Sequence, residues 1–236
     1  MDEEPYIPKH IALIPDGNRR WAKAQGVDIL EGHEAGARVF LDFMQWCAKR
    51  GVGVVSVFGF STENWKRSDR EVSHLLSLFE KGLIEQLAKY NERQEKEKKV
   101  CVRVIGEKER FPESLRSAIQ KIEAETQGNA GLVVNLALSY GGRWDITRAV
   151  RGILGEGYAP ETVTQEVFAS FLSTAGLPDV DLLIRTSGEQ RVSNFLLWQM
   201  AYAELFFVEK HWPAFTEQDL DEILKSYSAR QRRFGQ

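Results

Sequence analysis

The chain has 236 residues and a formal net charge of −3, with 43% hydrophobic and 28% charged residues. This length and apolar content predict one domain with a sizeable core, and they exclude a chain that charge repulsion keeps disordered. A near-neutral chain also lacks the basic field of a general nucleic-acid binder, so we expect no nucleic-acid partner. The two cysteines, Cys47 and Cys101, are too few for a disulfide framework or a multi-cysteine zinc site.

Short apolar runs alternate along the chain with longer helical patterns. The spacing predicts strands at residues 10–14, 54–60, 100–106, 132–140 and 181–188. It predicts helices from about residue 19, at 33–50, from 69 into the polar segment 91–99, at 112–126 and at 216–229. Because buried strands separated by helices need right-handed crossovers, we expect a single α/β domain over residues 1–236, with a mainly parallel central sheet flanked by helices. Residues 1–8 would be a flexible start and residues 228–236 a C-terminal tail.

The apolar segments predict no membrane span. The first ten residues are polar and acidic, without the apolar centre of a secretory signal. The most apolar long stretch, residues 195–208, is interrupted by Gln199 and Glu204 and is shorter than the roughly 18 residues of a spanning helix. We therefore expect a cytoplasmic protein whose contact with a membrane would be peripheral.

Polar segments follow four of the predicted strands at the point where each strand ends. They are residues 16–20, 61–65, 140–143 and 185–188. In parallel sheets, ligands bind beyond the carboxyl ends of the strands. The four segments are therefore expected to converge on one edge of the sheet.

The segment from Asp16 to Trp21 combines a glycine turn with the start of a helix. Free backbone N–H groups at a helix start, together with Arg19 and Arg20, suit a phosphate group. Asp16 would repel phosphate unless a divalent cation lies between them, and carboxylate and phosphate oxygens are ligands that Mg²⁺ prefers. The alternative is that Asp16 and Asn18 only cap the helix.

Two further segments carry polar groups of the same kind. Arg185, Arg191 and Ser193 suit a multiply charged phosphate ligand. Glu204 lies in an apolar run and needs a partner, which would be a metal ion or, more simply, an arginine. His33 could donate to an anion at the start of its helix, and a structural role is its alternative.

The segment STENWKR, residues 61–67, offers three different side chains. Asn64 could orient a group or accept a proton, Trp65 could form an apolar wall, and Arg67 could reach phosphate. An ordinary polar loop with one anchoring tryptophan is the alternative.

Taken together, these segments resemble the cis-prenyltransferase family, also called the undecaprenyl or dehydrodolichyl diphosphate synthase family. The matching strings are HIALIPDGNRRWAK, GHEAGA, FGFSTENWKR followed by EV, NLALSYGGRWDI, DLLIRTSGEQRVSNFLLWQMAYAELFF and RQRRFG, and they span nearly the whole chain in order. Pro15 and Arg19 replace the usual Met and Gly, a variant that resembles archaeal members.

The resemblance implies that isopentenyl diphosphate is added to an allylic diphosphate, of farnesyl or geranylgeranyl type, with formation of a cis double bond. Asp16 would hold Mg²⁺ on the allylic diphosphate, and Glu204 would be a further ligand of the metal. Asn64 aligns with the family's proposed proton acceptor. Since an amide is a poor base, we expect Asn64 to position the substrate while a substrate diphosphate takes the proton. The implied substrate-binding residues are Gly17, Asn18, Arg19, Arg20, Trp21 and His33 near the allylic diphosphate, Ser61, Thr62, Glu63, Trp65 and Arg67 beside Asn64, and Arg185, Arg191, Val192 and Ser193 near the isopentenyl diphosphate.

The family's terminal RxG element, matched by Arg233 and Gly235, reaches the active site across a homodimer. At roughly 0.8 kcal/mol per CH₂, each five-carbon unit of the product gains about 4 kcal/mol on leaving water. We therefore expect a hydrophobic tunnel beside the sheet, walled by the helices at 33–50 and 69–87. Residues 95–97 resemble the helix extension of long-chain members, which favours a long polyprenyl diphosphate, the precursor of a glycosyl carrier lipid.

Two positions depart from the family pattern. Ile29 stands where many members have a diphosphate-binding arginine, and Glu34 stands where lysine is frequent. Both changes lower the local positive charge, so an enzyme that makes a short chain or uses another acceptor is the alternative. A non-catalytic partner subunit is less favoured, because this chain keeps both the first motif and the terminal RxG.

Overall fold

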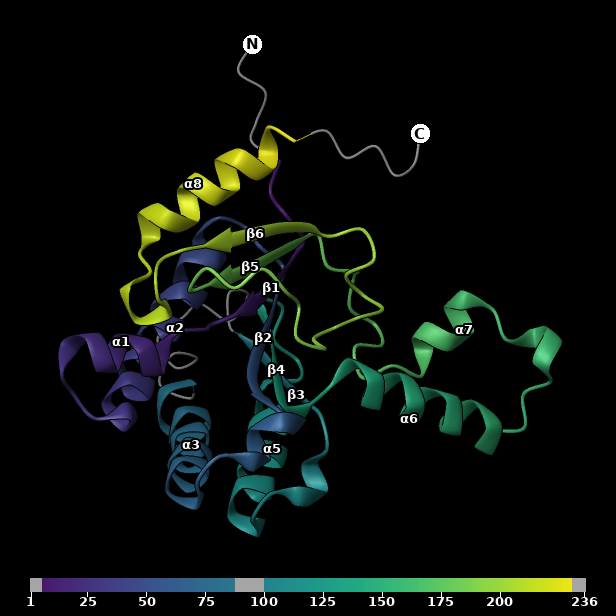
Figure 1. The fold of residues 1–236 in the computed structure, drawn as a ribbon. Helices are drawn as coiled ribbons and strands as arrows, with labels where there is room; N and C mark the ends of the chain where they lie inside the picture. Colours follow the sequence, from purple (N-terminus) through teal and green to yellow (C-terminus); the bar gives the residue numbers. More distant parts are fainter. Residues whose placement is uncertain (1–5, 88–99, 231–236) are drawn as a thin grey trace.

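A computed structural model describes residues 6–87 and 100–230 of the chain. Its centre is a six-stranded sheet in the order β3-β4-β2-β1-β5-β6, and every neighbouring pair is parallel. The strands are β1 (His10–Ile14), β2 (Val54–Ser61), β3 (Cys101–Ile105), β4 (Val133–Tyr140), β5 (Leu182–Thr186) and β6 (Glu204–Val208). The predicted single α/β domain with a parallel sheet is confirmed (Figure 1).

The strand order places a topological switch point at the middle of the sheet. From β1 the chain builds β2, β3 and β4 on one side, and it then returns to add β5 and β6 on the other. Ligands of open α/β sheets bind outside the carboxyl ends of the strands at such a point. Here this position lies between β1 and β5.

The described part of the chain has seven α-helices, five of them predicted and two, at 142–155 and 165–170, not predicted. They are α1 (Asn18–Gln25), α2 (Ile29–Lys49), α3 (Asp69–Lys81), α5 (Glu113–Thr126), α6 (Gly142–Gly155), α7 (Gln165–Ser170) and α8 (Glu217–Ser228). Helix α2 begins four residues before the predicted start, because Asp28 and Glu31 form a capping box. Helix α3 continues as the π-helix η2 (Gly82–Leu87). The predicted continuation at 91–99 lies outside the described residues.

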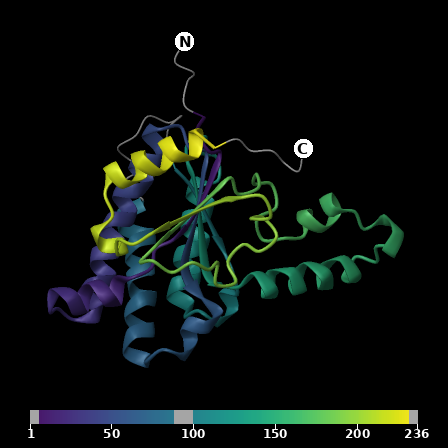
Figure 2. The same ribbon diagram turned by 45° about the horizontal axis from the view of Figure 1, so that its top comes forward.

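The two faces of the sheet are covered differently. Side chains of α2, α3, α5 and α8 form the larger core with one face. The other face is covered chiefly by the segment 192–203, which contributes Phe195, Leu196 and Met200, and by Trp144 at the start of α6. Helices α6 and α7 project from the sheet as an arm, seen in both ribbon views (Figures 1 and 2).

Strand β6 was not predicted. It begins at Glu204 and forms an edge of the sheet, and none of its five residues is fully buried. Its residues lie at the end of the long apolar stretch 195–208, so no separate short run marked this strand. None of the helices in the described part of the chain has the length and apolar character to cross a bilayer.

Candidate active site

A cavity of about 1550 Å³ lies between the sheet and helices α2 and α3. Its polar end is lined by the segments that follow β1, β2 and β5, including Asp16, Asn64 and Arg185. Its other walls are apolar and are formed by Phe40, Leu41, Val57, Phe58, Leu75, Leu78, Phe79, Leu83, Leu136 and Leu138. Three of the four predicted polar segments, those after β1, β2 and β5, and the predicted apolar walls on α2 and α3 therefore line one continuous space, whereas the segment 140–143 does not line it.

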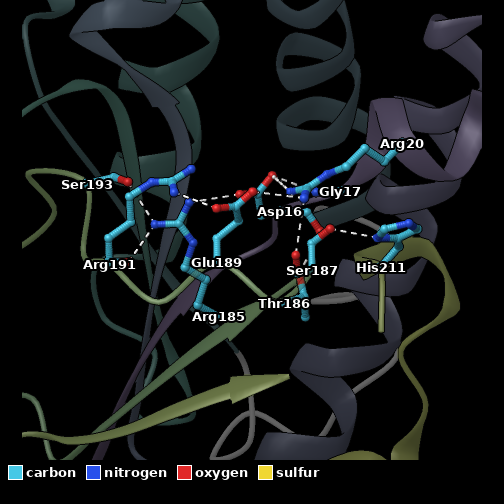
Figure 3. A network of polar contacts seen from close by, with 10 residues as sticks. All are labelled: Asp16, Gly17, Arg20, Arg185, Thr186, Ser187, Glu189, Arg191, Ser193 and His211. Atoms are coloured by element: carbon cyan, nitrogen blue, oxygen red, sulfur yellow. Dashed lines mark hydrogen bonds and ion pairs between the residues drawn. The ribbon is translucent and has the colours of Figure 1, made fainter. Parts of the chain in front are cut away.

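Asp16 lies directly beyond the carboxyl end of β1 and faces two arginines (Figure 3). Its Oδ2 accepts from Arg185 Nη2 at 2.8 Å, and its Oδ1 lies 3.2 Å from Arg20 Nη2. Its main-chain carbonyl accepts from Thr186 Oγ1 at 2.7 Å and from the Trp212 N–H at 3.0 Å. Burial alone would raise the pKa of Asp16, but the Arg185 hydrogen bond and the charges of both arginines hold it below its usual value. Asp16 is thus a fixed, ionised carboxylate at the mouth of the cavity.

Gly17 gives α1 its start and has a φ of 102°, which favours glycine. A Cβ at this position would lie 2.5 Å from Ser187 Oγ and 2.9 Å from His211 Nδ1, two atoms that are themselves 2.6 Å apart. The N-cap residue of α1 is Gly17, which has no side chain, and Asp16 Oδ1 accepts from the Gly17 N–H at 2.7 Å, one position before the helix. Asp16 therefore bonds the N-cap residue, and the first backbone N–H groups within α1, from Asn18 onward, are open to an anion.

Arg185 connects Asp16 to the segment that follows β5. Its side chain is 4% exposed, and its Nη1 donates to the Arg191 carbonyl at 2.5 Å and to Ser193 Oγ at 2.7 Å. Its Nε is buried and finds no hydrogen-bond acceptor among the described residues. Arg191 is more exposed and pairs with Glu189, whose carboxylate also accepts from Arg20 at 2.9 Å (Figure 3). Glu189 therefore joins the two arginine clusters.

His33 lies on the cavity wall in a second network of charges. Its Nε2 lies 3.1 Å from Glu71 Oε1, and the same oxygen accepts from Arg67 at 2.8 Å. Burial lowers the pKa of His33, while its hydrogen bond to Glu71 opposes that effect. For Glu71, burial would raise the pKa, but His33, Arg67 and Arg19 together lower it. Both side chains are buried, so this network fixes the orientation of Arg67.

The segment after β2 divides into residues that face the cavity and residues that do not. Ser61, Glu63, Asn64 and Arg67 line the cavity. Asn64 Oδ1 accepts from the Ser61 N–H at 3.0 Å, so this oxygen already stabilises the 3₁₀ turn η1 (Thr62–Lys66). This contact supports a positioning role for Asn64.

Five residues expected around the substrates lie outside the cavity lining: Trp21, Thr62, Trp65, Arg191 and Val192. Trp65 donates to Ser139 Oγ at 2.9 Å and packs against Phe60 and the larger core. The expected role of Trp65 as a cavity wall therefore does not hold in this structure. Val192 packs against the core on the other face of the sheet.

The family of the chain follows from comparison with known proteins. The family model described as "Putative undecaprenyl diphosphate synthase" matches residues 14–235. The chain belongs to this cis-prenyltransferase family.

Relatives and solved structures agree with this assignment. An isoprenyl transferase of Chromobacterium violaceum is 44% identical over 97% of this chain and 88% of its own length. A ditrans,polycis-undecaprenyl-diphosphate synthase of Aliivibrio fischeri, named as (2E,6E)-farnesyl-diphosphate specific, is 44% identical over 97% of this chain and 89% of its own. The structure of lavandulyl diphosphate synthase from Lavandula x intermedia, in complex with dimethylallyl diphosphate, superposes with a TM-score of 0.92 at 36% identity and covers 97% of this chain and 98% of its own. A probable undecaprenyl diphosphate synthase from Campylobacter jejuni gives a TM-score of 0.81 at 33% identity, covering 98% of this chain and 100% of its own.

Within one prenyltransferase chain, Glu204 does not meet Asp16. Glu204 begins β6 in register with Leu182, whereas Ile14, two residues before Asp16, is in register with Arg185. At about 3.3 Å per residue, Glu204 lies roughly 10 Å or more away along the strands, at the amino edge of the sheet. Its carboxylate pairs with Arg230 at 2.5 Å, so the arginine alternative is the one present in the structure. Arg233 and Gly235 lie outside the described residues.

Three residues of the site were not singled out from the sequence, Glu71, Glu189 and Asn194, whereas Thr186 belongs to the expected polar segment 185–188. Glu71 follows Arg67 by four residues at the start of α3, and this helical spacing is a signal for an ion pair. Glu189 pairs with Arg191 two residues later as well as with the distant Arg20, whereas the partners of Asn194 come from distant segments.

Proposed function

We propose that this prenyltransferase condenses isopentenyl diphosphate repeatedly with an allylic diphosphate of farnesyl or geranylgeranyl type. The product would be a long polyprenyl diphosphate, a precursor of a glycosyl carrier lipid. The observation that carries the proposal is the cavity, which is polar at one end and apolar along its length. Its volume of about 1550 Å³ exceeds the roughly 300–1,000 Å³ of ordinary small-ligand pockets. Such a space suits a growing hydrocarbon chain whose diphosphate stays at the mouth.

The allylic diphosphate would bind at the open start of α1. The helix, which begins at Asn18, offers backbone N–H groups there, and Arg19, Arg20 and His33 also line the cavity. As the bond between the allylic carbon and the diphosphate oxygen breaks, negative charge develops on the departing diphosphate, and fixed cations stabilise it.

The isopentenyl diphosphate would bind to Arg185, Arg191 and Ser193. This arrangement would place its terminal alkene carbon against the allylic carbon, where the new C–C bond forms. A proton then leaves the isopentenyl unit as the cis double bond forms, and a substrate diphosphate would accept it. Asn64 would position the reacting groups, since its amide oxygen is already bonded to the Ser61 N–H.

Asp16 fits a role as a Mg²⁺ ligand. It is an ionised carboxylate at the cavity mouth, next to arginines that suit diphosphate, and Mg²⁺ in such sites typically binds one or two carboxylates plus substrate phosphates. No group of three or more His, Cys, Asp or Glu side chains in residues 6–87 and 100–230 could hold a metal ion alone, so diphosphate oxygens would complete the coordination. When bound, Mg²⁺ supplies positive charge that stabilises the leaving diphosphate. Glu204 could serve as a further ligand only in the site of another copy of the chain.

We also propose a homodimer that uses the projecting arm. Helix α6 exposes Val150 and Leu154, the latter to 70%, and Tyr158 follows it on the same arm. Exposed apolar side chains of this kind mark a contact surface. A second copy would cover them and would bring the terminal RxG residues, Arg233 and Gly235, toward its partner's site. Release of a long apolar product would then occur at a membrane surface, through peripheral contact.

A short-chain enzyme is the second candidate, because one of the similar structures is a lavandulyl diphosphate synthase that holds dimethylallyl diphosphate. Ile29 lines the cavity where many relatives have an arginine, which is consistent with a different starter or acceptor. The test is incubation of the purified chain with Mg²⁺, radiolabelled isopentenyl diphosphate and each starter from dimethylallyl to geranylgeranyl diphosphate, followed by chromatography. Long products support the proposal, and products of a single condensation support the second candidate. The absence of any product with every starter would overturn both and leave a non-catalytic partner subunit.

A further inference from the structure

The turn at residues 193 and 194 has an unusual backbone. Of the five non-glycine residues with positive φ in the described parts of the chain, four lie between positions 187 and 196. Ser193 and Asn194 are consecutive, with φ of 49° and 64°. Asparagine tolerates this left-handed region better than most residues, and such conformations persist only where the surroundings enforce them. The contacts of Asn194 show what enforces this one.

On one side, Asn194 caps helix α6. The helix starts at Gly142 after Gly141, and neither residue has a side chain that could bond the first turn. The Asn194 carbonyl accepts from the Gly142 N–H at 2.6 Å, and its Oδ1 accepts from the Arg143 N–H at 2.9 Å. Two N–H groups that a helix start normally leaves open are therefore satisfied by a residue about fifty positions away.

On the other side, the Asn194 amide reaches the surroundings of Glu63, which lines the cavity next to Asn64. Burial would raise the pKa of Glu63, but its own N–H and the side chains of Ser61, Thr62 and Asn194 lower it. The fit around this amide is close, because a Cβ on Gly141 would lie 2.7 Å from Asn194 Nδ2. The side chain of Asn194 thus spans from the junction of β4 and α6 to the turn η1.

The residues just before Asn194 are those that bond Arg185. Arg185 Nη1 donates to the Arg191 carbonyl and to Ser193 Oγ, and Ser193 and Asn194 both line the cavity. With Asn194 held from two sides, the 191–193 segment has one position relative to Arg185. We propose that Asn194 is a positioning residue, which fixes Ser193 and Arg191 in the pocket for the second diphosphate by bonding both Glu63 and the start of α6. This inference rests on the proposed function, in which that pocket takes isopentenyl diphosphate.

A swap of the Asn194–Glu63 pair provides the main test. Asn194→Asp keeps an acceptor for the Arg143 N–H and tolerates positive φ, but it cannot donate to Glu63. We expect the KM for isopentenyl diphosphate to rise at least tenfold, with the KM for the allylic diphosphate changed less than twofold. The double variant Glu63→Gln, Asn194→Asp again has one hydrogen-bond donor and one acceptor at this pair, with the roles of the two positions exchanged. Its total charge equals that of the wild type. The fold-increase in the KM for isopentenyl diphosphate in the double variant should be at least fivefold smaller than the product of the fold-increases in the two single variants. A fold-increase equal to that product would overturn the proposal.

Asn194→Gly is the second variant, because it permits the backbone conformation and removes only the side-chain contacts. Its dissociation constant for isopentenyl diphosphate, measured by calorimetry without turnover, should rise at least fivefold. Asn129→Asp makes the matched chemical change at a residue that donates to the Val100 carbonyl, remote from the cavity lining, and should leave that constant unchanged. Wild-type binding by Asn194→Gly would overturn this inference alone. No binding of isopentenyl diphosphate to the wild-type chain would overturn the proposed function as well.

Discussion

Asp16 Oδ2 and Arg185 Nη2 lie 2.8 Å apart and join the carboxyl end of β1 to β5. The pair stands where the two proposed diphosphate pockets meet, since Asp16 belongs to the first and Arg185 to the second. A change at either residue should therefore affect both substrates.

Replacing Asp16 by Asn removes the proposed ligand charge and keeps the shape of the side chain. We expect turnover to fall by about 100-fold or more, because charge stabilisation at the leaving diphosphate contributes on this scale. The free energy of unfolding should change by only about 1 kcal/mol, because the carboxylate is partly exposed and Arg185 keeps two oxygen acceptors. Steady-state kinetics and thermal denaturation check both values, with Asp42→Asn on the exposed side of α2 as the control. Near-normal turnover would remove the assigned role of Asp16.

Gly17→Ala tests the close packing of Gly17 against the side chains of Ser187 and His211 at the start of α1. The added Cβ would meet Ser187 Oγ at 2.5 Å, and the φ of 102° is strained for any L side chain. We expect a loss of about 1–3 kcal/mol in stability and a raised KM for the allylic diphosphate, because the strain displaces the first turn of α1. Gly26→Ala is the matched control: it also has positive φ, but its added Cβ meets no atom within 4 Å. If both variants bind the allylic diphosphate equally well, the crowding behind Gly17 has no functional effect.

Gly59 lines the cavity on β2 and should influence product length. A Cβ there would lie 2.8 Å from Leu138 Cδ2 and 3.3 Å from Phe79, so Gly59→Val narrows the apolar part of the cavity. We expect shorter products with an unchanged KM for the starter, as measured by chromatography of the labelled product. Gly128→Ala, at an exposed position outside the cavity lining where an added Cβ meets no atom within 4 Å, should leave the product length unchanged. Products of wild-type length from Gly59→Val would place the growing chain elsewhere.

Two buried histidines should make the fold sensitive to mild acid. Burial lowers the pKa of His10, against its bond to the Pro178 carbonyl and the charge of Asp181, and it lowers the pKa of His33 in the same way. The unfolded chain therefore binds more protons than the folded chain as the pH falls below about 6.5. The free energy of unfolding should be greatest above this pH and should decrease on acidification, which urea denaturation at pH 7.5 and 5.5 would measure. Greater stability at pH 5.5 would contradict the expectation, and His10→Asn should reduce the pH dependence.

Sequence reasoning could predict those parts of the fold that local pattern determines. The five buried strands stood out as short apolar runs, and the parallel arrangement placed Asp16 and Arg185 at one edge of the sheet before their contact was known. Strand β6 escaped because its residues lie at the end of the long apolar stretch 195–208 and do not form a separate short run. The register of β6 in turn placed Glu204 at the opposite edge from Asp16.

The finer contacts of the site depend on residues that meet only through space. A helix that begins with two glycines shows no cap of its own, so nothing near α6 in the sequence pointed to Asn194. Trp65 was expected to line the cavity, but its ring is bonded to Ser139 and packed into the core. Such outcomes follow from side-chain direction, which the spacing of residues in a loop does not determine.

The strand order also bears on when the enzyme becomes competent during its synthesis. Asp16 and Arg185 are separated by 169 positions, and β5 joins the sheet only after β1, β2, β3 and β4 have been made. Since chains emerge from the ribosome at about 5–20 residues per second, a nascent polypeptide would have the helices that wall the hydrocarbon channel several seconds before its second anion pocket exists. Premature termination before β5 would therefore yield a fragment with an exposed apolar surface and no catalytic activity. Such a fragment would be a substrate for chaperones.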